Sequence, residues 1–291
     1  MPERIRALHI SDHDDIRDLC MGLWGVRDYI PERFPQWVDS EYMHTFGLFR
    51  NNRLVAMGTL QVTPERKKAW IKGLRVKLES QRKGLGYRIT EHLMDYARQV
   101  GVMTLRYGTS TRNKASMGLA EKLGFKLTNS VSYLRLEPPF PAHPAPSPSF
   151  VPLVIGPERF QEILATSPDL IESETFAFSW EFYNKDIEGI RQATDIGKVR
   201  VIIDGTGEAN TVFLSRSELR NDMRTSVYSI FSKNRSVFVD VFSRILGELE
   251  ETRTDRGAFF LGPRAEEWVQ YMVEIPEEYK GRRFLLYEAS I

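Results

Sequence analysis

The segment LRVKLESQRKGLGYRI, residues Leu74 to Ile89, joins a strand to a helix through a loop that contains two glycines. The strand is expected to end at Val76, and apolar residues at helical spacing from 89 to 100 predict a helix that begins near Gly86. The first N–H groups of a helix have no partner within it, and the helix dipole adds about half a positive charge there. Because Gly84 and Gly86 let the backbone approach a ligand closely, this loop is suited to hold a pyrophosphate group.

The first half of the chain alternates strands and helices around this segment. Asn51-Asn52 is a dipeptide suited to a tight hairpin turn, and Ser11-Asp12 can cap a helix that carries Ile16, Leu19 and Cys20 on one face. The expected strands are Ile5–Ile10, His44–Arg50, Leu54–Val62, Ala69–Val76, Thr104–Ser110 and Lys126–Leu136, and a further helix is expected over Lys114–Leu123.

The second half repeats part of this order, and a proline-rich stretch separates the two. EPPFPAHPAPSPSFVP, residues Glu137 to Pro152, cannot form the interior of a strand or helix, because proline fixes φ and lacks the N–H donor. After it, a strand hairpin, a helix from about Val237, a strand, a short helix and a closing strand follow one another. This pattern predicts an α+β protein with a mixed sheet in which residues 1–137 form one domain, 138–152 a linker and 153–291 a second lobe.

The composition excludes several classes of function. Lys and Arg number 40 against 39 Asp and Glu, so there is no net field to hold nucleic acid or an anionic membrane. The single cysteine, Cys20, rules out an internal disulfide and a zinc site built from cysteines. The five histidines show no metal-ligand spacing, and we expect no metal. No apolar run approaches the roughly 18 residues of a membrane span, and the charged N-terminus lacks a signal-peptide core, so we expect a cytoplasmic protein.

Two motifs carry a resemblance to a known family. Gln81-Arg82-Lys83-Gly84-Leu85-Gly86 resembles the R/Q-x-x-G-x-G/A signature of the GNAT acetyltransferases, and Val76 lies ten residues before Gly86, as the family's strand valine does. The segment from Asn113 to Phe125, NKASMGLAEKLGF, is similar to the family's N-x-x-A-x-x-L-Y-E-K-L-G-F block. Over residues 3 to 136 this resemblance implies a GNAT fold, and the second half is expected to be a degenerate GNAT-like lobe without a CoA loop.

The resemblance also implies which residues bind acetyl-CoA. Backbone groups on the strand before the loop would pair with the pantetheine arm, backbone amides of the loop would hold the pyrophosphate, and two side chains at the next strand–helix junction would contact the pantetheine. One backbone amide beside the thioester would also stabilise the oxyanion. In this sequence the three groups are Leu74, Arg75 and Val76; Gln81, Arg82, Lys83, Gly84, Leu85, Gly86 and Tyr87; and Asn113 and Ser116.

The usual acid and base of the family are missing from their usual places. Ala120 stands where the family keeps a tyrosine, and Lys72 where many members keep a glutamate. We therefore expect substitutes among Asp28, Tyr29 and Glu32, in the irregular segment before the hairpin, and Tyr107 on a strand beside the cleft. Tyr133 is a further candidate on a flanking strand, and Arg27 or Arg33 is a candidate to bind a substrate carboxylate.

The expected reaction is direct acetyl transfer from acetyl-CoA to a primary amine. WGVRDYIPERFPQW, KGLRV and FLLYEAS resemble segments of histidine N-acetyltransferase-like proteins, which implies a small amine, such as an amino acid, as the acceptor. Two alternatives stay open: acetylation of a protein or peptide amine, and a regulatory protein that binds acetyl-CoA without turnover. Neither nucleic acid nor a membrane is expected as a partner.

Overall fold

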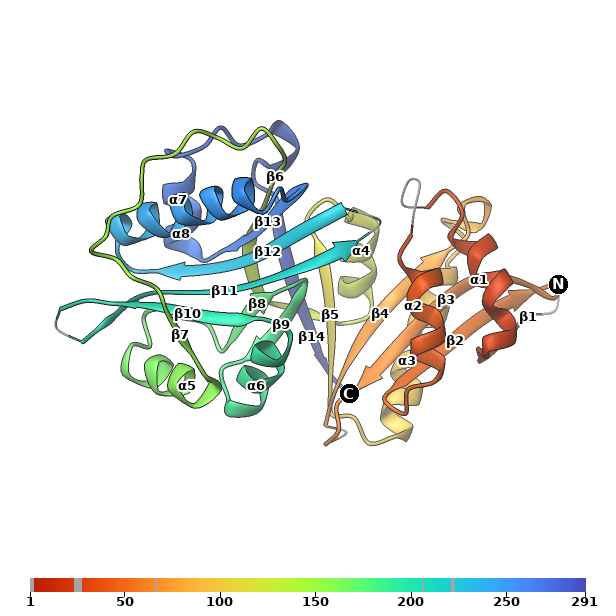
Figure 1. Cartoon of the computed structure of the whole chain (residues 1–291). Coiled ribbons are helices and arrows are strands. Elements are labelled where there is room, and N and C mark those ends of the chain that lie inside the picture. The colour runs from red at the N-terminus through yellow and green to blue at the C-terminus, as the bar shows by residue number, and fades with distance from the viewer. Residues whose placement is uncertain (1–2, 24–27, 66, 206, 221–222) are drawn as a thin grey trace. The chain divides into compact units, whose positions relative to one another are not determined.

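The computed structural model describes residues 3–23, 28–65, 67–205, 207–220 and 223–291 (Figure 1). Two compact units are present. Unit 1 consists of Met1–Thr109, Asn113–Thr128 and Leu286–Ile291, and unit 2 of Ser110–Arg112 and Asn129–Leu285.

Unit 1 is built on a mixed sheet whose strands follow the order β1-β2-β3-β4-β5. The first four are antiparallel neighbours, and β4 and β5 are parallel. The strands are β1 (Glu3–Ala7), β2 (Met43–Arg50), β3 (Arg53–Val62), β4 (Lys68–Val76) and β5 (Thr104–Ser110). The helices are α1 (His13–Cys20), α2 (Ile30–Val38), α3 (Leu85–Gln99) and α4 (Lys114–Lys122), with 3₁₀ turns η1 (Ile10–Asp12) and η2 (Leu78–Ser80).

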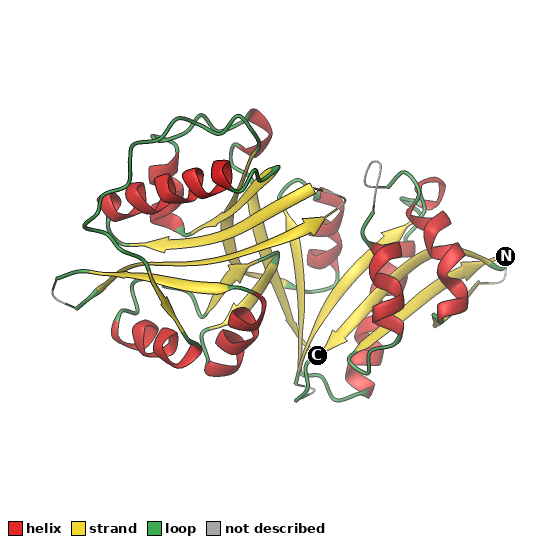
Figure 2. Cartoon of the chain, in the orientation of Figure 1, coloured by secondary structure: helices red, strands yellow, loops and turns green. Residues whose placement is uncertain are grey.

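Apolar stripes place these helices on the two faces of the sheet (Figure 2). Ile16, Leu19, Ile30 and Phe34 are fully buried and bring α1 and α2 together over one face. On the other face Leu85 and Ile89 of α3 pack against a separate set of strand residues. The hairpin turn between β2 and β3 has φ of 51° at Asn51 and 59° at Asn52, the left-handed conformation that asparagine tolerates and that such turns require.

Unit 2 repeats the succession of elements of unit 1, with an additional two-stranded sheet, β8–β9, between its first two helices. Strands β10, β11 and β12 are antiparallel neighbours, and β12 and β13 are parallel, as β4 and β5 are. Its strands are β7 (Leu153–Ile155), β8 (Thr175–Phe178), β9 (Glu181–Asn184), β10 (Lys198–Ile203), β11 (Ala209–Arg220), β12 (Met223–Ser232) and β13 (Arg256–Leu261). Its helices are α5 (Pro157–Thr166), α6 (Ile187–Ile196), α7 (Arg235–Glu251), α8 (Pro263–Val269) and the 3₁₀ turn η3 (Glu277–Tyr279).

The last strand of each half of the chain belongs mainly to the other unit, whereas the sequence suggests that each half keeps its own. Most of β6 (Lys126–Leu136) belongs to unit 2, where it pairs with β13 from Leu136–Gly257 to Ser132–Leu261. The end of β14 (Arg283–Ser290) belongs to unit 1. There the Ile291 N–H donates to the Met103 carbonyl, and Glu288 accepts from Arg106. The expected division at residues 137 and 153 therefore does not coincide with the compact units.

The proline-rich segment forms neither helix nor strand, as its prolines predict, and it is part of unit 2. The Ser147 N–H donates to Asp240 of α7, and Arg244 donates to the Ser147 carbonyl. These contacts hold the segment along α7, so it is more than a free spacer.

Within the described ranges, no helix combines the length and the apolar character that crossing a membrane would require.

Candidate active site

Strands β4 and β5 form a fork in unit 1. Their parallel pairing runs from Lys68–Thr104 to Ile71–Tyr107 and stops there, although β4 continues to Val76. On its other side β4 remains paired with β3, where a register shift between Met57 and Thr59 accompanies a φ of +61° at Gly73. An edge without a neighbouring strand presents N–H and C=O groups to a ligand. The fork therefore leaves residues 74–76 unpaired with β5, although Arg75 Nη1 donates to the Leu74 carbonyl and Gln81 Nε2 to the Val76 carbonyl.

The loop after β4 leads directly into the N-terminus of α3. The first hydrogen bond of the helix joins Arg88 N–H to Gly84 O, so the amides of Leu85, Gly86 and Tyr87 precede the helical ladder. The N-cap residue Gly84 provides no side-chain hydrogen bond to them. These amides are thus available to an anion.

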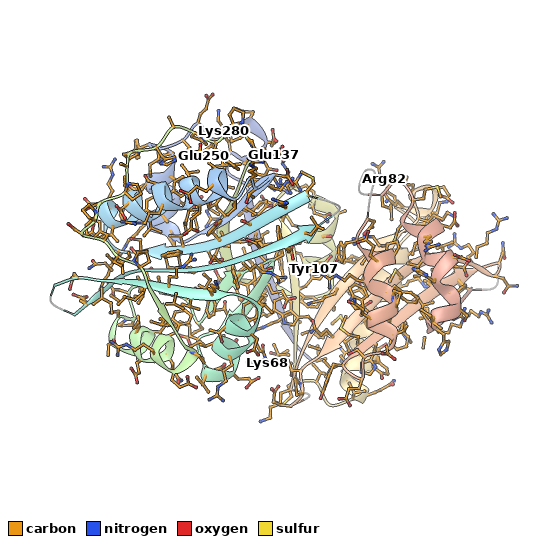
Figure 3. The ribbon with its side chains drawn as sticks, in the orientation of Figure 1. Lys68, Arg82, Tyr107, Glu137, Glu250 and Lys280 are labelled. Atoms are coloured by element: carbon orange, nitrogen blue, oxygen red, sulfur yellow. The ribbon has the colours of Figure 1, made fainter. Side chains whose placement is uncertain are left out.

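The loop between β4 and α3 is exposed to solvent. Gln81, Arg82, Lys83 and Gly84 are exposed, and Arg82, labelled in Figure 3, and Gly84 have φ values of +60° and +77°. A Cβ at Gly84 would meet nothing within 4 Å, so its left-handed backbone is what requires glycine. A Cβ at Gly86 would lie 3.7 Å from Val76 and 3.8 Å from Leu119, which are ordinary contacts. Contacts within the protein therefore do not require glycine at position 86.

Asn113 and Ser116 lie at the N-terminus of α4. Asn113 is the N-cap, and its Oδ1 accepts the Ser116 N–H at 3.1 Å. The Ser116 side chain lies near the Tyr107 phenol and opposes the rise of its pKa. The junction that the sequence predicts to contact pantetheine therefore lies near Tyr107, at the apex of the fork.

Tyr107 keeps its proton at neutral pH. Burial raises the pKa of its phenol, while the Ser116 side chain and the charge of Arg75 oppose that rise without cancelling it. The ring is 7% exposed and packs 6.2 Å from Phe125, measured between ring centroids. A buried, protonated phenol at the last paired residue of β5 is a suitable proton donor. Figure 3 labels Tyr107 in unit 1.

Asp28 is held in a buried ion pair rather than left available as a base. Arg75 Nε donates to its Oδ2 at 2.6 Å and Arg75 Nη2 to its Oδ1 at 3.0 Å, and the Ile30 N–H also donates to Oδ1. The exposed fraction of the side chain is 2% for Asp28 and 10% for Arg75. Burial alone would lower the pKa of Arg75, but the pair with Asp28 raises it above its ordinary value. Both carboxylate oxygens of Asp28 are therefore engaged in hydrogen bonds, and its expected role as a base stays a prediction.

The other candidates before the hairpin have different surroundings. Tyr29 is partly buried, lies edge-on to Trp37 at 6.3 Å and carries the Arg75 guanidinium over its ring at 5.4 Å. Glu32 and Arg33 are exposed on α2, and Arg33 is 3.4 Å from Gln36. Of these residues only Tyr29 joins the Asp28–Arg75 pair. Arg27 lies outside the described residues.

Cys20 lies against the same ion pair. Burial is the main reason that its pKa rises to about 12, and the charge of Asp28 adds to the rise. The thiol is 5% exposed. Because only a thiolate is an effective nucleophile, Cys20 is unsuited to carry an acetyl group.

Two residues of unit 1 that the sequence pattern did not single out form a second buried pair. Arg106 of β5 donates from Nε to Glu288 Oε1 at 2.7 Å and lies 5.7 Å from the Trp70 ring. These partners are 182 residues apart, so no local signal in the sequence connects them. In the part of the chain that the structure describes, no three His, Cys, Asp or Glu side chains are grouped to hold a metal ion.

Among its described residues, unit 2 has neither an unpaired strand end nor uncapped helix amides at the place that corresponds to the fork. Pairing of β12 and β13 continues to Ile230–Leu261, and the Gly262 N–H then donates to the Ile230 carbonyl. At the N-terminus of α7, Asn234 Oδ1 accepts the amides of Ser236 and Val237. The strand edge and the helix amides that are open in unit 1 are occupied here by the chain itself.

Comparison with known proteins agrees with this geometry. Residues 11–125 match the model of the acetyltransferase (GNAT) family. Over 80 residues the chain is 35% identical to the ribosomal protein bS18 alanine N-acetyltransferase of Escherichia coli K12. The aligned region covers 28% of this chain and 53% of that protein. The chain thus spans about half the length of the curated relatives it matches.

Solved structures resemble the fold over nearly the whole chain. A tandem GNAT protein from the clavulanic acid biosynthesis pathway has a TM-score of 0.62 at 11% identity, covering 99% of this chain and 98% of that one. A GCN5-related N-acetyltransferase from Sphaerobacter thermophilus gives the same TM-score and identity, covering 99% and 95%. These structures share the fold of this chain, which has two GNAT-like units. Residues 11–125 are similar to the GNAT acetyltransferase family.

Proposed function

We propose that this protein is an acetyl-CoA-dependent N-acetyltransferase whose reaction takes place at the fork of unit 1. The observation that carries the proposal is the end of β4–β5 pairing at Ile71 and Tyr107, beside the open amides of 85–87. The fork suits the pantetheine arm and the amides suit the pyrophosphate, helped by the cationic side chains of Arg82 and Lys83. Acetyl-CoA supplies the activated acetyl group.

Tyr107 is the residue that we propose as the proton donor. Its raised pKa keeps the hydroxyl protonated, and its position at the apex of the fork suits a role beside the departing thiolate. It would replace the family tyrosine, whose position holds the buried Ala120.

Tyr107→Phe tests this role. General acid catalysis contributes about 10²–10⁴-fold, so kcat is expected to fall at least 10²-fold while the Kd for acetyl-CoA changes little. Tyr96→Phe is the control, because it removes a tyrosine hydroxyl on α3 that lies 3.2 Å from His44 Nδ1. An unchanged kcat in Tyr107→Phe would exclude it as the acid.

For the acceptor, we propose a small molecule with a primary amine, such as an amino acid. The support is the resemblance of 24–37 and of the closing FLLYEAS to histidine N-acetyltransferase-like proteins. The α-amine of a peptide or protein is the second candidate, which is favoured by the 35% identity to an alanine N-acetyltransferase. Because Asp28 already pairs with Arg75, we do not assign it to the acceptor ammonium.

Calorimetry and a transfer assay on the full chain separate the alternatives. Acetyl-CoA is expected to bind once per chain, because in unit 2 the amides of α7 are capped by Asn234. Free amino acids, their amides, polyamines and peptides with N-terminal alanine would then be compared as acceptors. Preference for the peptides would favour the second candidate, binding without any turnover would favour a regulatory protein, and two bound molecules per chain would contradict the assignment of unit 2.

A further inference from the structure

Two arginines of unit 2 lack the acidic partner that their neighbours have. Arg135 of β6 and Arg282, just before β14, are both partly buried, and neither is within 4.0 Å of a carboxylate among the described residues. The other partly buried arginines described in this unit all form ion pairs with Asp or Glu. They are Arg200, Arg216, Arg244, Arg256, Arg264 and Arg283.

The two guanidinium groups gather around one tyrosine ring. Arg282 lies 4.9 Å from the ring centroid of Tyr279 and 4.9 Å from that of Tyr133, and Arg135 lies 5.7 Å from that of Tyr279. Tyr133 and Tyr279 are themselves 5.9 Å apart. Two like charges therefore share a partly buried aromatic site.

Few of the hydrogen-bond donors in this cluster are satisfied. Arg282 Nε is 3.4 Å from the Ser110 hydroxyl, and Arg135 Nη2 is 3.4 Å from the Tyr133 hydroxyl, both long contacts. Arg135 Nε is buried and has no hydrogen-bond partner among the described residues. Each guanidinium has five N–H donors, so most of them remain available to a ligand.

No described acid forms an ion pair with the cluster, although the charge of Glu137 acts on Arg135 from a longer distance. Glu137 follows Arg135 closely in the chain, but its Oε1 accepts from Arg256 at 3.1 Å. Glu277 pairs with Lys280 at 2.6 Å, and Glu278 is exposed. Glu137 and Lys280, labelled in Figure 3, mark this part of unit 2. A pair of cations removed from water without a counter-charge is unfavourable, and an anionic ligand would relieve that cost.

We propose that Arg135 and Arg282, with Tyr133 and Tyr279, form a carboxylate-binding site in unit 2. The planar fork of a guanidinium matches a carboxylate in bidentate geometry, and the tyrosine rings suit a flat apolar group attached to it. The ligand class is a small carboxylic acid. Two sources share this chemistry, the carboxylate of the acceptor amine and a separate carboxylate effector.

Direct binding is measured on the full chain labelled with ¹⁵N at arginine. The probe is benzoate, and its neutral counterpart benzamide is the matched control ligand. Benzoate is expected to shift the Nε–Hε signals of Arg135 and Arg282 in a saturable way, while benzamide at the same concentration leaves them in place. Equal shifts with both ligands, or no shift with benzoate, would overturn the proposal. Larger shifts at lower concentrations of inorganic phosphate would overturn the choice of a carboxylate.

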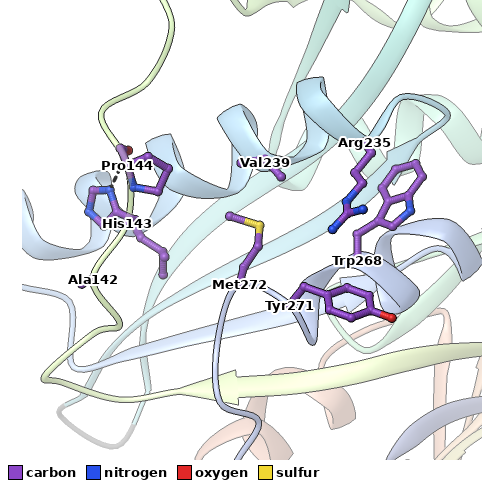
Figure 4. Close-up of a pocket in the computed structure, with 9 residues that line it drawn as sticks. Ala142, His143, Pro144, Arg235, Val239, Trp268, Tyr271 and Met272 are labelled. Atoms are coloured by element: carbon purple, nitrogen blue, oxygen red, sulfur yellow. Dashed lines mark hydrogen bonds between the residues drawn. The ribbon is translucent and has the colours of Figure 1, made fainter.

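Single arginine-to-glutamine variants test which arginines bind the carboxylate. Arg135→Gln and Arg282→Gln are each expected to weaken benzoate binding at least 10-fold. Arg235→Gln is the matched control, because Arg235 lies 5.3 Å from the Tyr271 ring in the same unit but at a different place. It lines a cavity of about 300 Å³ between the proline-rich segment and the ends of α7 and α8, together with Trp268 and Met272 (Figure 4). Loss of binding only in Arg235→Gln would move the site to that cavity. If a glutamine variant does not fold, the titration of the parent chain still decides.

A kinetic comparison separates the two sources, and this part rests on the proposed acetyltransferase activity. If the site binds the acceptor carboxylate, the preference in kcat/KM for an amino acid over its amide should disappear in Arg282→Gln. If it binds a separate effector, that preference should persist while benzoate binding is lost. The NMR titration needs no turnover, so failure of the site and failure of the proposed activity are distinguishable.

Discussion

Asp28 and Arg75 illustrate how a residue near the fork can be essential without reacting. Their ion pair is almost fully buried, and removing one partner would leave the other charge without compensation. Asp28→Ala is expected to lower the free energy of unfolding by about 3–5 kcal/mol in chemical denaturation. Asp95→Ala, which breaks the exposed Asp95–Arg98 pair, is the control, with an expected loss of about 0.5 kcal/mol or less.

The isosteric variant Asp28→Asn separates a structural role from a catalytic one. A large loss of stability is expected together with an acidic limb of the pH–rate profile that does not move. A protein of unchanged stability whose pH–rate profile has lost that limb would instead identify Asp28 as the base.

Cys20 is expected to resist alkylation while the protein is folded. A pKa of about 12 leaves roughly one thiol in 10⁴ ionised at pH 8, and the side chain is buried. Iodoacetamide labelling followed by mass spectrometry should therefore be slow in buffer and fast in denaturant. Rapid labelling of the folded chain would show that the thiol is accessible.

The same raised pKa gives stability a pH dependence. Because the pKa of the folded thiol lies above its ordinary value of 9.0, the stabilising contribution is complete below about pH 9 and is lost as the pH rises towards 12. Cys20→Ala should therefore show a smaller loss of stability over this pH window than the parent chain.

At the level of elements, the start of α3 combines Gly84, which the backbone requires, with Gly86, which we propose the ligand requires. Gly86→Ala adds a Cβ at ordinary contact distances, so stability should change little. The Kd for acetyl-CoA, measured by calorimetry, is nevertheless expected to rise at least 10-fold, because the added methyl group lies where the pyrophosphate approaches. An unchanged Kd would place the pyrophosphate elsewhere.

Gly84 requires a different control, because its φ is +77°. Gly101, at the other end of α3, has a φ of +85° and also has no atom within 4 Å of a built Cβ. Alanine at either position imposes a similar backbone strain, of about 1 kcal/mol. Only Gly84→Ala should also weaken acetyl-CoA binding, and equal effects of the two variants on the Kd would mean that the loss comes from strain alone.

For the whole molecule, the C-terminal strand is expected to be necessary for unit 1. Deletion of 286–291 removes Glu288 from the buried Arg106 and also the hydrogen bond from Ile291 to Met103. The deletion should lower the free energy of unfolding by at least about 3 kcal/mol and weaken acetyl-CoA binding. Glu288→Gln isolates the ion pair, and a truncated chain with the stability of the parent would show that the first half folds without its last strand.

Much of unit 1 could be predicted from the sequence because its signals are local. The strand ending at Val76, the glycine loop, the start of α3 and the Asn51-Asn52 turn each depend on residues within a few positions of one another. The same holds for the capping of α4 by Asn113. Both halves were also recognisable as a repeated order of elements, since hydrophobic periodicity reports each element separately.

Only the tertiary structure decided which distant groups meet. Asp28 and Arg75 are 47 residues apart, and Arg106 and Glu288 are 182 apart, so no periodic pattern links them. Their pairing places an expected base in a buried ion pair, and its catalytic role stays a prediction. The compact units likewise depend on which edge each closing strand joins, and β6 and β14 join theirs through contacts between remote parts of the chain. Local pattern determined the elements and the loop for an anion, whereas long-range packing determined the charges that surround them.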